Sequence, residues 1–182
     1  PPLRSSTASD VYKRQSQYRV GLNGKEFRLY KFRTMTESSD ESIHEDHYKN
    51  LSLNKNIHPS LSPDDPIRIE NDDRITNIGS FLRKTSLDEL PNIINVLFGQ
   101  MSFVGPRPLV KYESDLYGEY LESRNSIKPG ITGLAQIQGR LDLSLQERLY
   151  WDLIYVEKKS FIYDLQIIIK TIISVISRRG AN

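Results

Sequence analysis

A proline close behind two adjacent acids restricts how the middle of this chain can fold. In "SLDELPNIINVLFG", residues 86–99, an apolar stripe at helical spacing is formed by Leu90, Ile93, Ile94 and Leu97. Proline lacks an N–H and disrupts a helix interior, but it is tolerated in a first turn. With Ser86 as the helix cap, Pro91 would fall inside the helix, whereas with Asp88 as the cap it lies in the first turn. We therefore expect a helix that begins near Ser86 to Asp88 and ends at about Phe98.

The remaining patterns predict a mostly helical α+β single domain with a β-hairpin. Asn23-Gly24, between apolar residues around Val20 and Phe27, is a strong hairpin signal because both turn positions favour positive φ. Helical spacing appears in four further segments: 75–82 with Asp73 as the expected cap, 109–125, 144–158 and 161–177. Residues 134–138 are typical of a short strand, and the polar residues 36–73 of a long loop.

Composition narrows the class of protein. The 182 residues suit one domain with a real core, and a net charge of +2 is too small to indicate nucleic-acid binding. The absence of cysteine excludes disulfides, thiol catalysis and cysteine metal sites. No apolar run reaches the roughly eighteen residues of a transmembrane helix. Residues 1–15, rich in Ser, Thr and Pro, are interpreted as a disordered or non-native tail.

The acid pair Asp88-Glu89 has two interpretations. In the first, Ser86 and Glu89 form a capping box, and the acids complement the helix dipole. In the second, the helix start binds a phosphate, Arg83 and Arg107 grip its oxygens, and a carboxylate attacks phosphorus or holds Mg²⁺. Phosphoryl transfer fits better than glycosidic chemistry, because paired glycosidase carboxylates face each other across a sugar and adjacent residues seldom do. The residues alone leave both interpretations open.

Four stretches of the chain together resemble the bacterial sugar transferase family, the small monotopic phosphoglycosyl transferases that begin glycan assembly on undecaprenyl phosphate. They are "KFRTM" at 31–35, "DRITNIGSFLRKTSLDELPNIINVLFGQMSFVGPRP" at 73–108, "KPGITGLAQIQGR" at 128–140 and "WDLIYVEKKSFIYDLQIIIKTI" at 151–172. The stretches occur in family order and cover most of residues 18–177. The join of "TSLDELPN" to "MSFVGPRP" is the most specific part.

The resemblance implies a reaction and a role for the acid pair. The family transfers a sugar 1-phosphate from a UDP-sugar to polyprenyl phosphate with Mg²⁺ and releases UMP. By this resemblance Asp88 is the nucleophile that forms a phosphosugar-aspartyl intermediate, Glu89 orients groups, and both acids lie at the metal. The transfer would be the first membrane step of exopolysaccharide, capsule, O-antigen or glycoprotein glycan synthesis.

The resemblance also assigns six positions to substrate binding. They are Arg83 and Arg107 for the phosphate oxygens, Lys31 and Arg33 for the same anions, and Arg140 and Asp164 for the nucleotide or sugar. The family usually has Trp in its "GITGxAQ" motif, and Leu134 stands there in this chain. The resemblance therefore leaves the identity of the sugar open.

Family members begin with an apolar re-entrant segment, and this chain has polar residues 1–15 in its place. The resemblance implies that residues 16–182 form the catalytic domain without that segment, on the cytoplasmic face of the bacterial inner membrane. Its partners would be membrane lipid, the two substrates and no nucleic acid, with a homodimer as one allowed arrangement. Residues 161–177 would form either a core helix or a helix on an anionic membrane surface, and the resemblance favours the surface.

Two alternatives from other functional classes stay open. A non-catalytic membrane-peripheral scaffold would keep the fold and would not need Asp88. A soluble Mg²⁺-dependent phosphohydrolase would use the same aspartyl chemistry with water in place of the polyprenyl acceptor.

Overall fold

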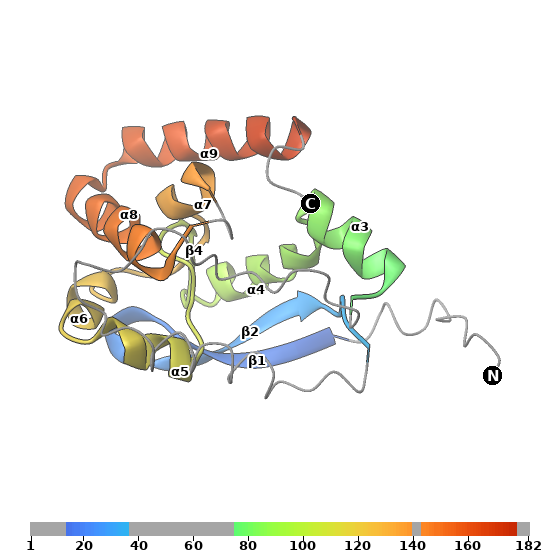
Figure 1. The fold of residues 1–182 in the computed structure, drawn as a ribbon, viewed down its shortest axis with the longest axis horizontal. Coiled ribbons are helices and arrows are strands. Elements are labelled where there is room, and N and C mark those ends of the chain that lie inside the picture. The colour runs from blue at the N-terminus through green and yellow to red at the C-terminus, as the bar shows by residue number, and fades with distance from the viewer. Residues whose placement is uncertain (1–13, 37–74, 140–142, 178–182) are drawn as a thin grey trace.

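The computed structural model describes residues 14–36, 75–139 and 143–177 (Figure 1). Within these ranges the chain is an α+β single domain, mostly helical, with two small two-stranded sheets, as predicted. The predicted loop over 36–73 lies outside the described residues apart from Thr36, and so does the expected cap Asp73. Of the predicted tail over 1–15, only Arg14 and Gln15 are described, and they belong to the first β-strand, so the tail prediction was wrong for these two residues.

The first sheet is the predicted hairpin. β1 (Arg14–Val20) pairs antiparallel with β2 (Glu26–Phe32), and the short helix η1 (Leu22–Gly24) joins them. Asn23 and Gly24 both have positive φ, at 53° and 75°, which is the conformation that makes this dipeptide a turn signal.

The second sheet corrects one prediction. β3 (Ser102–Val104) pairs parallel with β4 (Gly130–Thr132), whereas residues 134–138, predicted as a strand, form the helix α7 (Leu134–Gln138). Gly133 remains extended and accepts a hydrogen bond from the Ile137 N–H, so the strand ends and one helical turn begins there. The mixed apolar and polar residues of this short segment fit either period, and burial of Leu134 and Ala135 decides for the helix.

The other helices follow the predicted segments with altered ends. They are α3 (Asn77–Thr85), η2 (Leu87–Glu89), α4 (Asn92–Leu97), α5 (Lys111–Ser114), η3 (Asp115–Tyr117), α6 (Tyr120–Arg124), α8 (Leu145–Lys158) and α9 (Phe161–Ile176). The cap of α3 is Thr76, whose hydroxyl accepts a 2.9 Å hydrogen bond from the Gly79 N–H. The predicted helix over 109–125 is three short pieces, and α8 and α9 match their predictions closely.

The hairpin and α9 lie on opposite sides of the domain, with α7 and α8 between them in the view of Figure 1. Buried side chains of β3, α7, α8 and α9 form one core cluster, made of Val104, Leu134, Tyr155 and Ile167. Ile167 is the one fully buried residue of α9, and the helix exposes a row of large apolar side chains: Phe161, Ile162, Leu165, Ile169, Ile172, Ile173 and Ile176. Among the described residues, no helix combines the length and apolarity needed to cross a membrane.

Candidate active site

The acid pair lies in a 3-10 turn between two helices, and neither acid caps an α-helix. Asp88 and Glu89 belong to η2, and Pro91 occupies the cap position of α4. Ser86 has left-handed backbone angles (φ 57°, ψ 19°), and its N–H closes α3 by donating to the Arg83 oxygen at 3.2 Å. Because Ser86 ends the preceding helix, its side chain makes no cap hydrogen bond, and the capping-box interpretation is wrong.

A buried amide holds α4 against the hairpin. Asn95 is fully buried, and its Nδ2 donates to the Arg28 oxygen at 2.6 Å, while its Oδ1 accepts from the Tyr30 N–H at 3.3 Å. These bonds satisfy the edge of β2 that β1 leaves open. Lys31, the next residue on β2, is thereby brought beside η2.

Arg83 reaches the site from α3. Its Nε donates to the Thr34 hydroxyl at 2.9 Å, and the Thr34 oxygen accepts from the Thr76 N–H at 3.0 Å. The backbones are in very close contact here, because a Cβ added to Gly79 would lie 2.0 Å from the Thr34 oxygen. Arg33, adjacent to Thr34 in the chain, is half-buried on the same segment.

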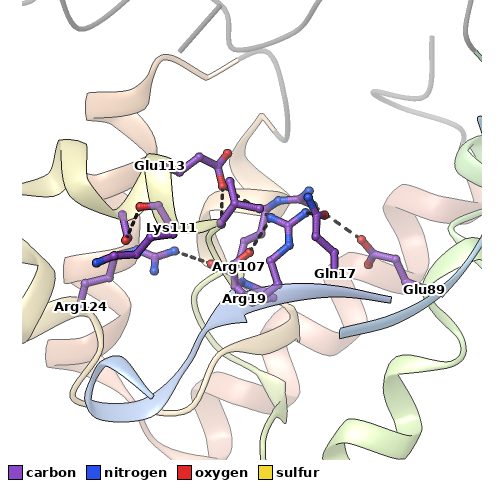
Figure 2. Close-up of polar contacts among 10 residues, drawn as sticks. Gln17, Arg19, Glu89, Arg107, Lys111, Glu113 and Arg124 are labelled. Carbon is purple, nitrogen blue, oxygen red and sulfur yellow. Dashed lines mark hydrogen bonds and ion pairs between the residues drawn. The ribbon is translucent and has the colours of Figure 1, made fainter. Parts of the chain in front are cut away.

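Arg107 reaches the acid pair from the Gly-Pro-Arg-Pro turn. Its Nη1 lies 3.7 Å from Glu89 Oε1, and about a third of each side chain is exposed, 34% and 30% respectively (Figure 2). A pair this accessible adds little stability but leaves both groups reachable by a substrate.

Most of the charged groups around Asp88 are cations. Burial raises the pKa of the Asp88 carboxyl above its usual range, although Lys31, Arg83 and Arg107 each act to lower it. Burial, together with repulsion from Arg19, Arg107 and Arg83, lowers the pKa of Lys31 to about 8 against the attraction of Asp88. The cations outnumber the two carboxylates, so the site is suited to an anion.

The structure thus brings together five of the predicted residues: Lys31, Arg83, Asp88, Glu89 and Arg107. Arg140 lies outside the described residues. Asp164 lies near the start of α9, where its Oδ1 accepts a 2.7 Å hydrogen bond from the Tyr155 hydroxyl. Its predicted place beside nucleotide or sugar stays a prediction.

Sequence reasoning missed a set of buried charges behind the site. Arg124 and Asp152 form an ion pair at 2.8 Å with side chains only 1% and 2% exposed, and Arg19 pairs with Glu113 at 3.6 Å. Burial raises the pKa of Asp152, against the lowering effect of the Arg124 charge. The only local signal is a charged residue among apolar neighbours, as at Asp152 in "YWDLI".

A profile of the family described as "Bacterial sugar transferase" matches residues 7–178. The chain belongs to the bacterial sugar transferase family. The match covers every described residue of the site, and the sequence resemblance stated above is therefore confirmed.

Curated bacterial sugar transferases show the same relationship over 90% of this chain. The "UDP-galactose-lipid carrier transferase" of Erwinia amylovora is 42% identical over 163 residues, and the "Undecaprenyl-phosphate galactose phosphotransferase" of Salmonella typhimurium is 44% identical over 163. The "Exopolysaccharide production protein ExoY" of Sinorhizobium fredii is 41% identical over 163 residues. The matched region spans 33% of each of the first two sugar transferases and 70% of the third.

Proposed function

We propose that this chain transfers a sugar 1-phosphate from a UDP-sugar to undecaprenyl phosphate, releases UMP, and uses Asp88 as the attacking group. The observation that carries the proposal is the position of Asp88, partly withdrawn from water and surrounded by Lys31, Arg83 and Arg107. The names of the Erwinia and Salmonella relatives support a lipid-carrier or undecaprenyl-phosphate acceptor and galactose transfer.

In the first step a carboxylate oxygen of Asp88 attacks the donor phosphorus that carries the sugar. The new oxygen–phosphorus bond forms as the bond from that phosphorus to UMP breaks, and UMP leaves with the electron pair. Lys31, Arg83 and Arg107 stabilise the negative charge that develops on the phosphate oxygens. The sugar 1-phosphate is then held on Asp88.

In the second step a phosphate oxygen of undecaprenyl phosphate attacks the same phosphorus. The bond to Asp88 breaks, the carboxylate is restored, and the sugar leaves on a lipid pyrophosphate. Glu89, paired with Arg107 at 3.7 Å, keeps that guanidinium directed at the site through both steps.

Asp88 and Glu89 also suit a Mg²⁺ ion shared with the donor pyrophosphate. Mg²⁺ keeps several waters and takes one or two carboxylates together with substrate phosphates. Across residues 14–36, 75–139 and 143–177 no group of three or more His, Cys, Asp or Glu side chains gathers, and a shared site of this kind needs only the two present. When bound, the ion would neutralise the charge of the pyrophosphate and of the departing UMP.

We place the domain at the cytoplasmic face of the bacterial inner membrane, where its lipid acceptor resides. The exposed apolar row of α9 supports this location, since an amphipathic helix can lie in the interface with its apolar side toward the acyl chains. The bound lipid surface would then cover side chains such as Phe161 and Ile176, which are 84% and 77% exposed.

The test is the intact mass of the chain after incubation with Mg²⁺ and a panel of UDP-sugars, in vesicles of bacterial lipid. The wild type is expected to gain one sugar phosphate and to release UMP, whereas Asp88→Asn gains nothing. Asp115→Asn is the matched control, because Asp115 is exposed and pairs with Lys111 at 3.0 Å on α5. An adduct on Asp88→Asn would show that Asp88 is not the nucleophile.

The same experiment separates the alternatives. Addition of undecaprenyl phosphate should discharge the wild-type adduct to lipid, whereas a phosphohydrolase would discharge it to water at the same rate without the acceptor. The absence of an adduct and of UMP with every donor, in vesicles and with acceptor present, would favour the non-catalytic scaffold.

A further inference from the structure

The Gly-Pro-Arg-Pro turn that carries Arg107, together with the following Leu109, is held at four successive backbone carbonyls. Pro106 O accepts from Gly130 N at 3.0 Å, Arg107 O from Arg124 Nη2 at 2.6 Å, Pro108 O from Arg19 Nη1 at 3.2 Å, and Leu109 O from Val20 N at 2.8 Å. Pro106 and Pro108 fix φ on either side of Arg107. The backbone from which the Arg107 side chain extends therefore has very little freedom.

Arg124 is the donor directly behind Arg107. Its Nε donates to Asp152 Oδ2 at 2.8 Å, and its guanidinium lies 5.2 Å from the centre of the Tyr117 ring. Because the planar guanidinium is fixed by these two contacts, its Nη2 has one direction available, toward the Arg107 oxygen. Figure 2 shows this connection running from Arg124 through Arg107 to Glu89.

Arg19 holds the next carbonyl from the hairpin side. Its Nη1 lies 3.2 Å from the Pro108 oxygen and 3.6 Å from Glu113 Oε2, and its Nη2 donates to Gln17 Oε1 at 2.7 Å. Arg19 is 7% exposed, so its charge is withdrawn from solvent as that of Arg124 is. Two buried arginines from distant elements thus bind consecutive carbonyls of one turn.

Stability alone does not account for this arrangement. Burial of an ion pair such as Arg124–Asp152 removes two charges from water, and a well-packed apolar pair of similar volume is often at least as stable. The charged pair does supply something that an apolar pair lacks, namely a directed donor for the Arg107 carbonyl.

We propose that Arg124 and Arg19 are positioning residues that hold the Gly-Pro-Arg-Pro turn so that Arg107 is directed at Glu89 and at the donor pyrophosphate. The inference rests on the proposed function and adds to it the source of the Arg107 geometry. Neither residue touches the reacting atoms. Arg124 acts through the backbone of Arg107, and Arg19 acts through the backbone of Pro108 in addition to the effect of its charge on Lys31.

A double-mutant cycle tests the proposal. Arg107→Met should lower kcat/KM by roughly 100-fold, as loss of a charge-stabilising donor typically does. Arg124→Lys keeps a charge beside Asp152 but lacks the fork that also reaches Arg107, and it should lower kcat/KM by roughly tenfold. The double variant should be no worse than Arg107→Met alone, because Arg124 acts only through Arg107. Multiplicative losses in the double variant would overturn the proposal.

Arg148→Lys is the matched control. Arg148 is 3% exposed and its charge acts on the same Asp152, but the donor to the Arg107 carbonyl is Arg124. The factor by which Arg148→Lys lowers kcat/KM, whatever its size, should multiply with the factor for Arg107→Met. An Arg148 cycle as non-additive as the Arg124 cycle would also contradict the proposal. Arg19→Lys repeats the test from the other side of the turn, should Arg124→Lys fail to fold.

A readout without turnover separates this inference from the proposed function. Hydrogen exchange of the backbone N–H groups in residues 102–110 should accelerate at least roughly tenfold in Arg124→Lys and stay unchanged in Arg148→Lys. Unchanged exchange in Arg124→Lys would refute the positioning role. If the wild type transferred no sugar phosphate while hydrogen exchange in the two variants followed this expectation, the proposed function would be refuted. The role of Arg124 in holding the turn would still be supported.

Discussion

The side-chain amide of Asn95 donates a 2.6 Å hydrogen bond to the backbone oxygen of Arg28. A single helical side chain thereby substitutes for a neighbouring strand at the open edge of β2, and it also accepts from the Tyr30 N–H at 3.3 Å. The contact keeps α4, and with it the turn that carries Asp88, next to the strand that carries Lys31.

Asn95→Ala should destabilise the fold and lower activity. The substitution leaves the Arg28 oxygen and the Tyr30 N–H without their partner, and loss of buried hydrogen bonds of this kind costs about 2–3 kcal/mol. Urea denaturation measures the change. Asn77→Ala, at an exposed position of α3, should stay within about 0.5 kcal/mol of the wild type. Equal stabilities for the two variants would contradict the role assigned to Asn95.

The activity should decline as pH rises through about 8. Lys31 has a pKa of about 8, so above this pH it loses the charge that binds donor phosphate. In a plot of kcat/KM against pH, Lys31→Arg should lack this decline because arginine stays charged. A decline at the same pH in Lys31→Arg would assign it to another group.

The same lysine should lower the stability of the fold below pH 8. Its folded pKa of about 8 lies below the ordinary value of 10.5, so the unfolded chain binds more protons between these values. The cost of burying the charged form is complete below pH 8 and disappears as pH rises to 10.5. Lys31→Met should therefore be more stable than the wild type at pH 7, with a difference that shrinks toward pH 10.5. A constant difference would contradict this assignment.

The acid side of the pH profile should report Asp88. Burial raises its pKa, so kcat/KM should begin to fall at a higher pH than an ordinary aspartate would give. Arg83→Met removes a charge that lowers this pKa, and the fall should move to still higher pH. Arg28→Met, which removes an exposed arginine from the far side of β2, should leave its position unchanged. The measured quantity is the pH at which kcat/KM falls, so differences in absolute rate between the variants do not affect the comparison.

Gly79→Ala should separate Arg83 from the hairpin. The added Cβ would lie 2.0 Å from the Thr34 oxygen, and overpacking of this kind costs about 1–3 kcal/mol, more than alanine's higher helix propensity returns. Thermal denaturation measures the loss. Ser80→Ala, at the next position of α3, should have almost no effect, and a Gly79→Ala variant as stable as Ser80→Ala would show that the two backbones are not in contact.

Ile173→Asp should weaken binding to lipid vesicles. The side chain is 59% exposed on the apolar row of α9, and a charge there should lower the fraction bound to phosphatidylglycerol vesicles by roughly tenfold. Flotation of vesicles measures the bound fraction. Ser126→Asp adds the same charge at an exposed position beyond α6, and an equal loss there would point to simple repulsion from the anionic lipid.

Local signals predicted the elements whose pattern is self-contained. Asn23-Gly24 forms the expected turn because its backbone preference needs no distant partner. α8 and α9 match their predicted ranges because long periodic segments are unambiguous. Arg83 and Arg107 were placed beside Asp88 from the residues themselves and Lys31 from the family resemblance. In the structure the charges of all three act on Asp88, and their roles toward a substrate stay a prediction.

The failures occur where a distant contact decides between local options. Ser86 could begin one helix or end another, and its left-handed backbone ends α3. The strand prediction for 134–138 was wrong because burial against other elements favoured a helical turn. Pairing of Arg124 with Asp152 joins residues 28 positions apart, and no periodic pattern marks such a contact.

The Tyr155 hydroxyl connects α9, the helix proposed to face the membrane, to the segment that leads to Arg107. Its single proton is shared between Asp164 Oδ1 on α9 at 2.7 Å and the Val104 oxygen at 3.2 Å, directly before the turn that carries Arg107. Thr132 on β4 adds a second link, through a 2.7 Å hydrogen bond with Thr171 of α9. These bonds connect α9 to the segment before Arg107, so a lipid surface bound at the outer face of α9 would stand at a fixed distance from Arg107. An acceptor would then be usable only if its phosphate projects that far from the lipid.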